Sequence, residues 1–165
     1  MDISLIPGYN RPELVRELFE EYANLIISRD PRFEEYLAIQ SFEEELAHLE
    51  HKYGGPGGRL YLAYWKDRLA GCVAMRQIDE YRCEMKRLYV RLVFRGIGMG
   101  DLLVDTLIRD ARNHGYKYML LDTFPFLERA IEMYRKRGFY EIGKYTDSPM
   151  DNTIYMQLDL SSNQE

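Results

Sequence analysis

The sequence predicts a mixed α/β (α+β) fold in which strands outnumber helices. Apolar residues recur every three or four positions in some segments and every second position in others, and the two kinds of segment are interleaved. The 165 residues include 46% hydrophobic and 30% charged residues, a composition that supports a buried core. We expect residues 1–160 to form one domain and residues 161–165 a flexible tail.

The first third of the chain predicts a strand and two helices. The strand covers residues 2–6, and the first helix begins at Pro12 and ends at Asp30-Pro31. A second helix is predicted from Ser41, where Ser41-Phe42-Glu43-Glu44 has the form of a capping box, to Tyr53 before a glycine-rich loop.

The remaining two thirds alternate between strands and helices. A hairpin is predicted from two β-prone runs, and the last strand alternates between apolar and polar positions, with Tyr155 among those facing outward. The expected strands are 59–65, 69–77, 84–90, 118–121, 139–143 and 153–160, and the expected helices run from the glycines near residue 98 to 114 and from 126 to 137.

Composition excludes several classes of protein. The longest apolar stretch, Leu69 to Met75, is far shorter than the roughly 18 to 20 residues that cross a bilayer, so no membrane span is expected. The first residues carry an acid and too short an apolar run for a signal peptide. Two lone cysteines, Cys72 and Cys83, are expected to be buried small side chains, and a cytoplasmic location is the default.

The net charge of −5 is unevenly distributed. Residues 1–58 hold 12 acidic and 5 basic residues, whereas residues 82–95 hold five basic residues and one acidic residue. The basic segment is too small for a nucleic-acid surface, so no nucleic-acid partner is expected. It matches a phosphorylated small molecule instead.

The glycines beside this basic segment indicate a phosphate site. Gly96-Ile97-Gly98-Met99-Gly100 follows a strand and opens a helix, which points backbone N–H groups and the positive end of the helix dipole into one concavity. A Walker loop is excluded, because Asp101 stands where that motif has lysine. A dinucleotide fingerprint stays open as an alternative, with Asp122 near the spacing of its ribose-binding acid.

A third pattern, Arg/Gln-x-x-Gly-x-Gly/Ala, is met by Arg95, Gly98 and Gly100. Here the sequence resembles the GNAT-type N-acetyltransferase superfamily, in which this motif binds the pyrophosphate of acetyl-CoA. Lys86-Arg87-Leu88-Tyr89-Val90 resembles the superfamily's fourth strand, and Ala130-x-x-x-Tyr134-x-x-x-Gly138-Phe139 resembles its last helix running into the sixth strand. The resemblance covers essentially the whole chain. It implies a mixed, mostly antiparallel sheet of about six to seven strands flanked by about four helices.

The resemblance implies acetyl-CoA as cosubstrate and no metal. The fourth and fifth strands are expected to splay apart, with the pantetheine arm of acetyl-CoA between them. Many members place an asparagine after the fifth strand, whereas this chain has Leu121-Asp122-Thr123, so Thr123 is the expected substitute. The expected cofactor contacts are Leu88, Tyr89, Val90, Arg95, Gly96, Ile97, Gly98, Met99, Gly100, Asp101, Thr123, Tyr134 and Arg137.

Two residues are expected to be catalytic. Acetyl transfer needs a neutral amine, a donor for the oxyanion and a proton for the leaving thiolate. The resemblance implies that Tyr134 protonates the sulfur and that a backbone N–H of Leu88 or Tyr89 holds the oxyanion. Glu84 is the expected base, acting directly or through water. Strand alternation is expected to place on one face Glu84, Lys86, Leu88 and Val90.

Plainer interpretations remain beside these. Glu84 could pair with a neighbouring base (Arg82, Lys86 or Arg87), and Tyr134 could be a core tyrosine, one of 14 in the chain. Residues 135–137, all basic, suit either a solvated helix end or the 3′-phosphate of CoA. His48 and His51 have helical spacing but no third metal ligand nearby, so no metal is expected.

The expected function is transfer of an acetyl group from acetyl-CoA to a primary amine on a small molecule or peptide. The alternatives are a catalytically silent acyl-CoA sensor and a plain interaction module. The acidic first third favours a cationic acceptor, bound by the loop between the first two helices (residues 28–40) and by residues 144–152. Many members of the superfamily dimerise through their last strands, and the strand over 153–160 would allow a homodimer.

Overall fold

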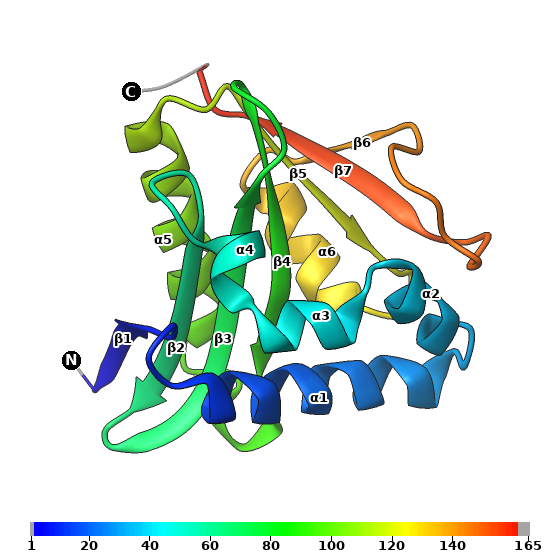
Figure 1. The fold of residues 1–165 in the computed structure, drawn as a ribbon. Helices are drawn as coiled ribbons and strands as arrows, with labels where there is room; N and C mark the ends of the chain where they lie inside the picture. Colours follow the sequence, from blue (N-terminus) through cyan, green and yellow to red (C-terminus); the bar gives the residue numbers. More distant parts are fainter. Residues whose placement is uncertain (1, 162–165) are drawn as a thin grey trace.

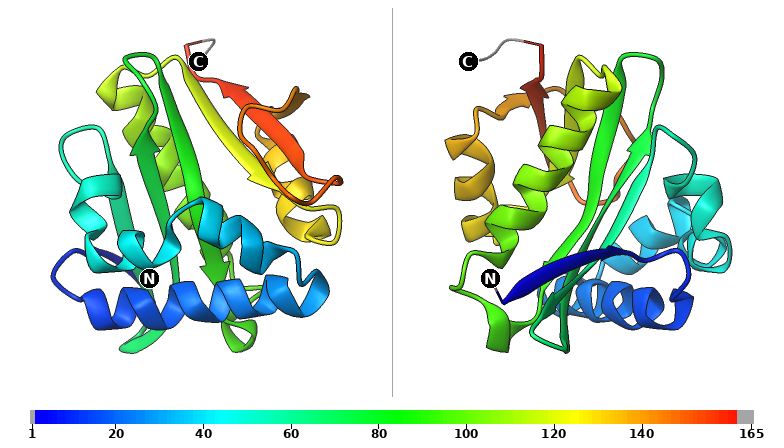
Figure 2. Two further views of the ribbon diagram at one scale, coloured as in Figure 1. Left: turned by 45° about the vertical axis from the view of Figure 1, so that its right-hand side comes forward. Right: turned by 90° about the vertical axis from the view of Figure 1, so that its left-hand side faces the viewer.

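The computed structural model describes residues 2–161, and its strands form one sheet with helices on both faces (Figures 1 and 2). The strands are β1 (Ile3–Pro7), β2 (Arg59–Trp65), β3 (Arg68–Gln77), β4 (Arg82–Val90), β5 (Tyr118–Thr123), β6 (Tyr140–Ile142) and β7 (Ile154–Asp159). The α-helices are α1 (Pro12–Arg29), α2 (Phe33–Ile39), α3 (Phe42–Ala47), α4 (Leu49–Tyr53), α5 (Met99–His114) and α6 (Glu128–Lys136), and a 3₁₀ turn covers Leu92–Phe94. The mixed α/β class is confirmed. Residues 162–165 of the predicted tail lie outside the described part.

The sheet has seven strands in the order β1-β2-β3-β4-β5-β7-β6. Every neighbouring pair is antiparallel except β4 and β5, which are parallel. The predicted mixed, mostly antiparallel sheet is therefore confirmed. The last strand, β7, lies between β5 and β6, with Tyr155 to Gln157 paired on both sides. A dimer that adds a second copy to the middle of this strand is excluded, because no free backbone edge is left there.

Helices cover the two faces of the sheet separately. Figure 2 shows α1 to α4 on one side and α5 on the other. Leu103, Leu107 and Ala111 form a fully buried stripe of α5 at helical spacing, and they pack with residues of β3, β4, β5 and α6. Each buried leucine contributes about 1.5–3 kcal/mol relative to an exposed one. Phe19 of α1 and Tyr53 of α4 pack on the opposite face.

The segment between α1 and β2 differs from the sequence prediction. Residues 33–39, expected to lie in a loop, form α2. Ser41 has φ 58° and its side chain makes no capping hydrogen bond, so the predicted capping box is wrong. The predicted single helix over 41–53 breaks at His48 (φ −140°) into α3 and α4. The break turns the chain from α1 toward β3 (Figure 1), so tertiary packing overrides local helix preference.

The last strand buries a residue that alternation placed outside. Tyr155, expected to face outward, is only 7% exposed. Its ring packs on Tyr145 with 5.3 Å between the ring centroids, and its hydroxyl donates to the Thr146 carbonyl. The loop between β6 and β7 therefore covers this face of β7, which the pattern of the strand alone does not reveal.

A β-bulge changes the faces of β4. Ala74 pairs with Lys86 and Cys72 pairs with Tyr89, so a single residue of β3 faces two residues of β4. Arg87 takes a positive φ of 63° to accommodate the extra residue. Met85, Leu88 and Val90 consequently pack in the cluster that contains α5, whereas Tyr89 packs in the cluster of α1 and α4. The predicted common face of Glu84, Lys86, Leu88 and Val90 is wrong, because alternation cannot anticipate the inserted residue.

Candidate functional site

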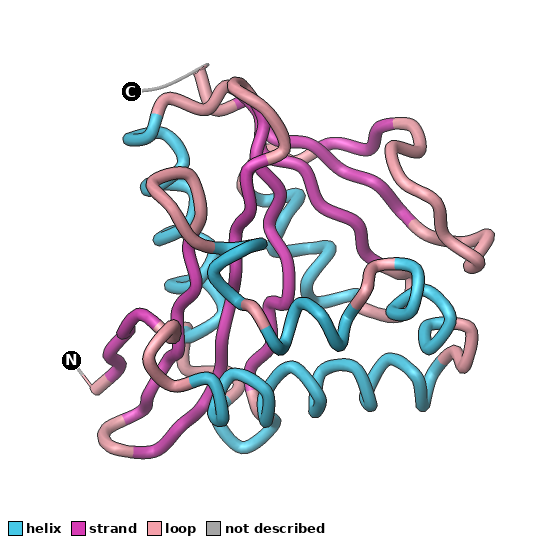
Figure 3. The backbone as a smooth tube through the Cα atoms, viewed as in Figure 1, coloured by secondary structure: helices cyan, strands magenta, loops and turns pink. Residues whose placement is uncertain are grey.

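A cleft opens where β4 and β5 diverge. Their pairing is confined to Arg82–Glu84 opposite Tyr118–Leu120, and beyond this point the two strands splay apart, as the tube in Figure 3 shows. The expected splay is confirmed. The cleft has a volume of about 770 Å³ and is walled by the second half of β4, the end of β5, the start of α5, α6 and one side of α1.

Most of the expected cofactor contacts line this cleft. Those that do are Leu88, Tyr89, Val90, Arg95, Gly96, Gly98, Met99, Gly100, Asp101, Thr123 and Tyr134. Two do not. Ile97 is 45% exposed and lies outside the lining. Arg137 is held by Asp101 and Asp105 of α5 at 2.8 and 2.6 Å and also donates to the Met133 carbonyl. Lys136 lines the cleft in its place.

The start of α5 offers a run of free donors. Gly96 and Gly98 have φ of 84° and 87°, a left-handed conformation that favours glycine. The backbone N–H groups from Gly96 to Asp101 donate no hydrogen bond to any residue of the described chain, and the first capping bond is Leu102 N–H to the Gly98 carbonyl. A Cβ at Gly98 would meet no protein atom within 4 Å. These amides can therefore receive the oxygens of an anion.

Tyr134 lies in the wall of the same cleft. It is 6% exposed, and its ring packs on Phe139 with 5.5 Å between the ring centroids. Its hydroxyl makes no hydrogen bond within residues 2–161, unlike most buried tyrosine hydroxyls. Burial, together with Tyr22 and Asp122, raises the pKa of Tyr134, so the hydroxyl keeps its proton at neutral pH. The group is thus a proton donor without a partner in the described chain.

Glu84 is buried beside the cleft. It is 2% exposed and does not line the cavity. Its oxygens accept hydrogen bonds from Arg76 Nε and the Tyr145 hydroxyl, both at 2.6 Å. The predicted pairing partners Arg82, Lys86 and Arg87 are not its ion-pair partners, since Arg76 takes that place. Burial acts to raise the pKa of Glu84, but the charges of Lys86 and Arg76 and the two hydrogen bonds outweigh it and lower the pKa.

The basic segment is largely neutralised within the chain. Arg87 binds Glu45 at 2.8 Å, Arg91 binds Glu21 at 2.7 Å and also contacts Glu17, and Arg82 binds Asp79 at 2.9 Å. Glu17 and Glu21 of α1 and Glu45 of α3 thus form ion pairs with basic residues of β4 and of the turn after it. The charge pattern that suggested two separate partners is, in good part, an internal set of ion pairs.

Sequence reasoning missed two polar groups at this site. Asp122 lines the cleft and accepts a hydrogen bond from the Tyr36 hydroxyl of α2. Tyr145, from the loop between β6 and β7, contacts Glu84. From the sequence, Asp122 has a role only as a ribose-binding acid. Its position at the end of β5, opposite the glycine-rich turn, is the signal that could have identified it.

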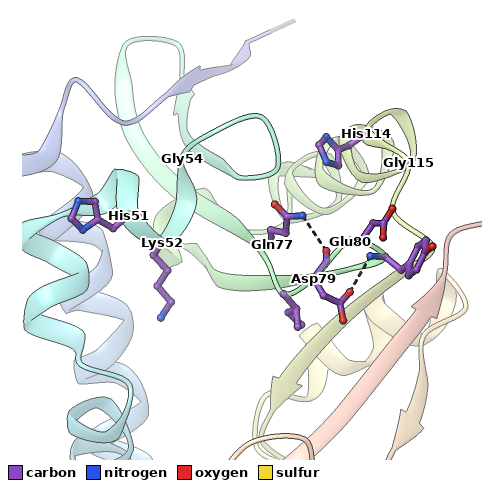
Figure 4. A pocket seen from close by; sticks show the side chains of 10 residues that line it. His51, Lys52, Gly54, Gln77, Asp79, Glu80, His114 and Gly115 are labelled. Carbon is purple, nitrogen blue, oxygen red and sulfur yellow. Dashed lines mark hydrogen bonds between the residues drawn. The ribbon is translucent and has the colours of Figure 1, made fainter.

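A second pocket lies at the opposite end of β4. Figure 4 shows its lining, including Lys52, Gln77 and Asp79. His51 and His114 lie on different sides of it, and His51 instead stacks on His48 with 4.9 Å between ring centroids. No cluster of three or more histidine, cysteine or acidic side chains in residues 2–161 could hold a metal ion. Within the same range, none of the helices combines the length and apolarity needed to cross a membrane.

Comparison with known proteins gives a consistent result. The family model of the acetyltransferase (GNAT) family matches residues 14–139. An uncharacterized N-acetyltransferase from Dictyostelium discoideum is 30% identical, covering 97% of this chain and all of that protein. Another from Schizosaccharomyces pombe is 39% identical over 76% of this chain and 78% of its own length.

Solved structures share the fold. A GNAT-family acetyltransferase of Staphylococcus aureus superimposes with a TM-score of 0.74 at 21% identity, covering 96% of this chain and 99% of the other. One from Elizabethkingia anophelis, with acetyl-CoA bound, gives a TM-score of 0.66 at 20% identity over 96% of this chain and 98% of its own. With its family model, its relatives and its fold in agreement, this chain belongs to the GNAT family of N-acetyltransferases.

Proposed function

We propose that this enzyme transfers an acetyl group from acetyl-CoA directly to a primary amine in the cleft between β4 and β5. The observation that carries the proposal is the Tyr134 hydroxyl, which is buried, protonated and without a partner in the described chain, in a cleft that also contains the free amides of α5. A site that only bound acyl-CoA would not need a buried proton donor.

Different regions of the cleft suit different parts of acetyl-CoA. The amides from Gly96 to Asp101 suit its pyrophosphate, because they combine free donors with the positive end of α5. The side of β4 that β5 leaves unpaired, at Leu88 to Val90, suits the amide groups of pantetheine. Thr123 supplies a hydroxyl on the opposite wall, and Lys136 replaces Arg137 as the proposed cation for the 3′-phosphate.

The chemistry follows from these positions. The neutral amine attacks the thioester carbonyl, and the backbone N–H of Leu88 or Tyr89 stabilises the oxyanion. When the carbon–sulfur bond breaks, Tyr134 gives its proton to the leaving thiolate. The amine loses one proton overall, and the tyrosinate must regain one. The protons balance when the amine's proton passes to the tyrosinate, either directly or by exchange with solvent.

Glu84 is proposed to act indirectly. Its carboxylate is saturated by Arg76 and Tyr145, and its lowered pKa makes it a weak proton acceptor. We therefore assign it a role through a water molecule: its carboxylate orients the water that takes the proton, and its negative charge stabilises the positive charge that develops on the attacking nitrogen. Direct contact with the amine would require it to leave a salt bridge of 2.6 Å.

Binding and turnover together test this function. We expect acetyl-CoA to raise the melting temperature, and a panel of primary amines to yield free thiol and an N-acetylated product detected by mass. A thermal shift without turnover on any amine would support the alternative of a silent acyl-CoA sensor. Absence of a shift at saturating acetyl-CoA would contradict both.

A further inference from the structure

Lys86 is a buried cation that forms no ion pair with any of the described residues. It is 8% exposed and lines the cleft between β4 and β5. Among residues 2–161, no carboxylate lies within ion-pair distance of its ammonium group, and no group accepts a hydrogen bond from it. Burying a lysine is costly unless it is paired, so an unpaired lysine in a ligand cleft points to an anion supplied by the ligand.

The neighbouring carboxylates are already engaged. Glu45 binds Arg87 and Lys52, both at 2.8 Å, and accepts a hydrogen bond from Tyr53. Glu84 binds Arg76. These two carboxylates bind three other cations. The charge of Lys86 acts on Glu84, but Lys86 forms no ion pair with either carboxylate. Burial first, and then the charge of Lys86, lower the pKa of Lys52 to about 8, so the ammonium groups of Lys52 and Lys86 lie near enough to repel each other.

The position of Lys86 along β4 separates it from the phosphate end. Lys86 precedes Val90 by four residues, a strand length of about 13 Å, and the amides of α5 lie farther on. Only about 7 Å of strand separate Lys86 from Leu88, where the thioester carbonyl would lie. A pyrophosphate on α5 cannot also neutralise Lys86, whereas an anion a few bonds from the attacking amine can.

The opposite wall carries the complementary charge. Asp122 of β5 lines the same cleft, and one of its oxygens accepts the hydrogen bond from Tyr36. No cation forms an ion pair with Asp122 among the described residues. The cleft therefore presents an unpaired ammonium from β4 and an unpaired carboxylate from β5, an arrangement complementary to a zwitterion.

We propose that the acceptor is an amino acid, whose carboxylate binds Lys86 and whose amino group lies on the side of Asp122 before transfer. This inference rests on the proposed acetyl transfer and names its substrate class. It replaces a purely cationic acceptor, because three of the acids that suggested one, Glu17, Glu21 and Glu45, are ion-paired with arginines of the basic segment.

Conjugates that join CoA and acceptor test this inference whatever side chain the acceptor carries. In each probe, a –CH2–C(=O)– linker joins the sulfur of CoA to the nitrogen of the acceptor. Two probes carry glycine or β-alanine, and two matched probes carry methylamine or ethylamine, which lack the carboxylate. Calorimetry on the wild-type enzyme should show at least tenfold tighter binding for a carboxylate conjugate than for its partner. Lys86→Met should abolish that difference, and Lys86→Arg should retain most of it.

Controls keep the outcomes distinct. Lys117→Met removes an exposed lysine at the start of β5 and should leave both affinities unchanged. Equal affinity of the wild type for both kinds of conjugate would overturn the amino-acid acceptor while leaving acetyl transfer intact. Failure of every conjugate to bind would overturn the proposed function itself.

The acyl donor is the other source of a carboxylate. If Lys86 served the donor, succinyl-CoA would bind more tightly than acetyl-CoA, and Lys86→Met would remove that preference. We expect no such preference in the wild type. Its appearance would overturn the assignment of Lys86 to the acceptor.

Discussion

At the scale of single residues, the chemistry available in the cleft depends on which polar side chains already have a hydrogen-bond or ion-pair partner within the chain. Tyr134 and Glu84 are both expected from the sequence to be catalytic, yet their environments are opposite. The Tyr134 hydroxyl has no hydrogen-bond partner in the described chain and lines the cleft, whereas both oxygens of Glu84 are taken. The sequence motif can place a tyrosine on the right helix, but the pairing of Glu84 is set by Arg76 and Tyr145, which lie on other segments of the chain.

Replacement of Tyr134 by phenylalanine tests the proton donor. We expect Tyr134→Phe to lower kcat by about tenfold or more with little change in the Kd of acetyl-CoA, because only the hydroxyl is lost. Stopped assays of thiol release and calorimetry give the two values. Tyr140→Phe, on exposed β6, is the matched control. An unchanged kcat would reduce Tyr134 to a packing residue.

The lowered pKa of Glu84 predicts the shape of the pH profile. A carboxyl with a pKa below 4.5 stays ionised from pH 6 to 9, so it contributes no inflection there. The rate should instead follow the neutral fraction of the amine and rise about tenfold per pH unit below the amine's pKa. Comparing kcat/KM for two accepted amines of different pKa checks this. A shared inflection near pH 6 to 7 would indicate a base on the enzyme.

At the scale of elements, local patterns predicted most of the fold. Regular periodicity identified α1 and α5, since each buries one face over many residues. The β-prone runs identified the strands β2 to β5 and β7. The sequence does not predict α2, and it predicts α3 and α4 as a single helix. These short helices are positioned by contacts with β3, β4 and β5 that no local pattern reveals. The bulge at Arg87 was also missed. Its positive φ is maintained by tertiary contacts of the guanidinium, which no local pattern reveals.

The contact of α3 with β4 should be important for stability. Glu45 is 3% exposed and joins Arg87, Lys52 and Tyr53 in one hydrogen-bonded network. Glu45→Gln leaves the Arg87 charge buried without its counter-ion, so we expect a loss of about 3 kcal/mol in the free energy of unfolding. Urea denaturation measures this loss. Glu44→Gln, an exposed neighbour on the same helix, should change stability by less than about 0.5 kcal/mol.

At the scale of the whole molecule, charge links the two parts of the chain. The acidic first third and the basic segment pair with each other through Glu17, Glu21 and Glu45. The count of charges therefore predicts a cluster of cations at this site, but it does not tell which of these cations lack an ion-pair partner. Arg82, Arg87 and Arg91 are paired, whereas Lys86 has no ion-pair partner among residues 2–161.

These ion pairs predict sensitivity to acid. Glu45 and Glu21 have lowered pKa values in the folded chain, so below the ordinary value of 4.5 the unfolded state binds more protons. Their contribution is complete above that pH and is lost as the pH falls through the folded pKa values. The urea midpoint should stay level above about pH 5 and drop between about pH 4.5 and pH 2, less steeply in Glu45→Gln. A midpoint that is constant over this range would contradict the importance of these pairs.

The central claim is that acetyl-CoA binds in the cleft with its pyrophosphate on the amides of α5. Calorimetric titration of acetyl-CoA tests it most directly, using wild type, Gly98→Val and Gly55→Val. Gly55 has a similar positive φ of 73° and equally open surroundings but lies in a loop outside the cleft, so it controls for backbone strain. We predict that wild type and Gly55→Val bind with similar Kd and that Gly98→Val binds at least a hundredfold more weakly. Equal binding by all three proteins would contradict the account.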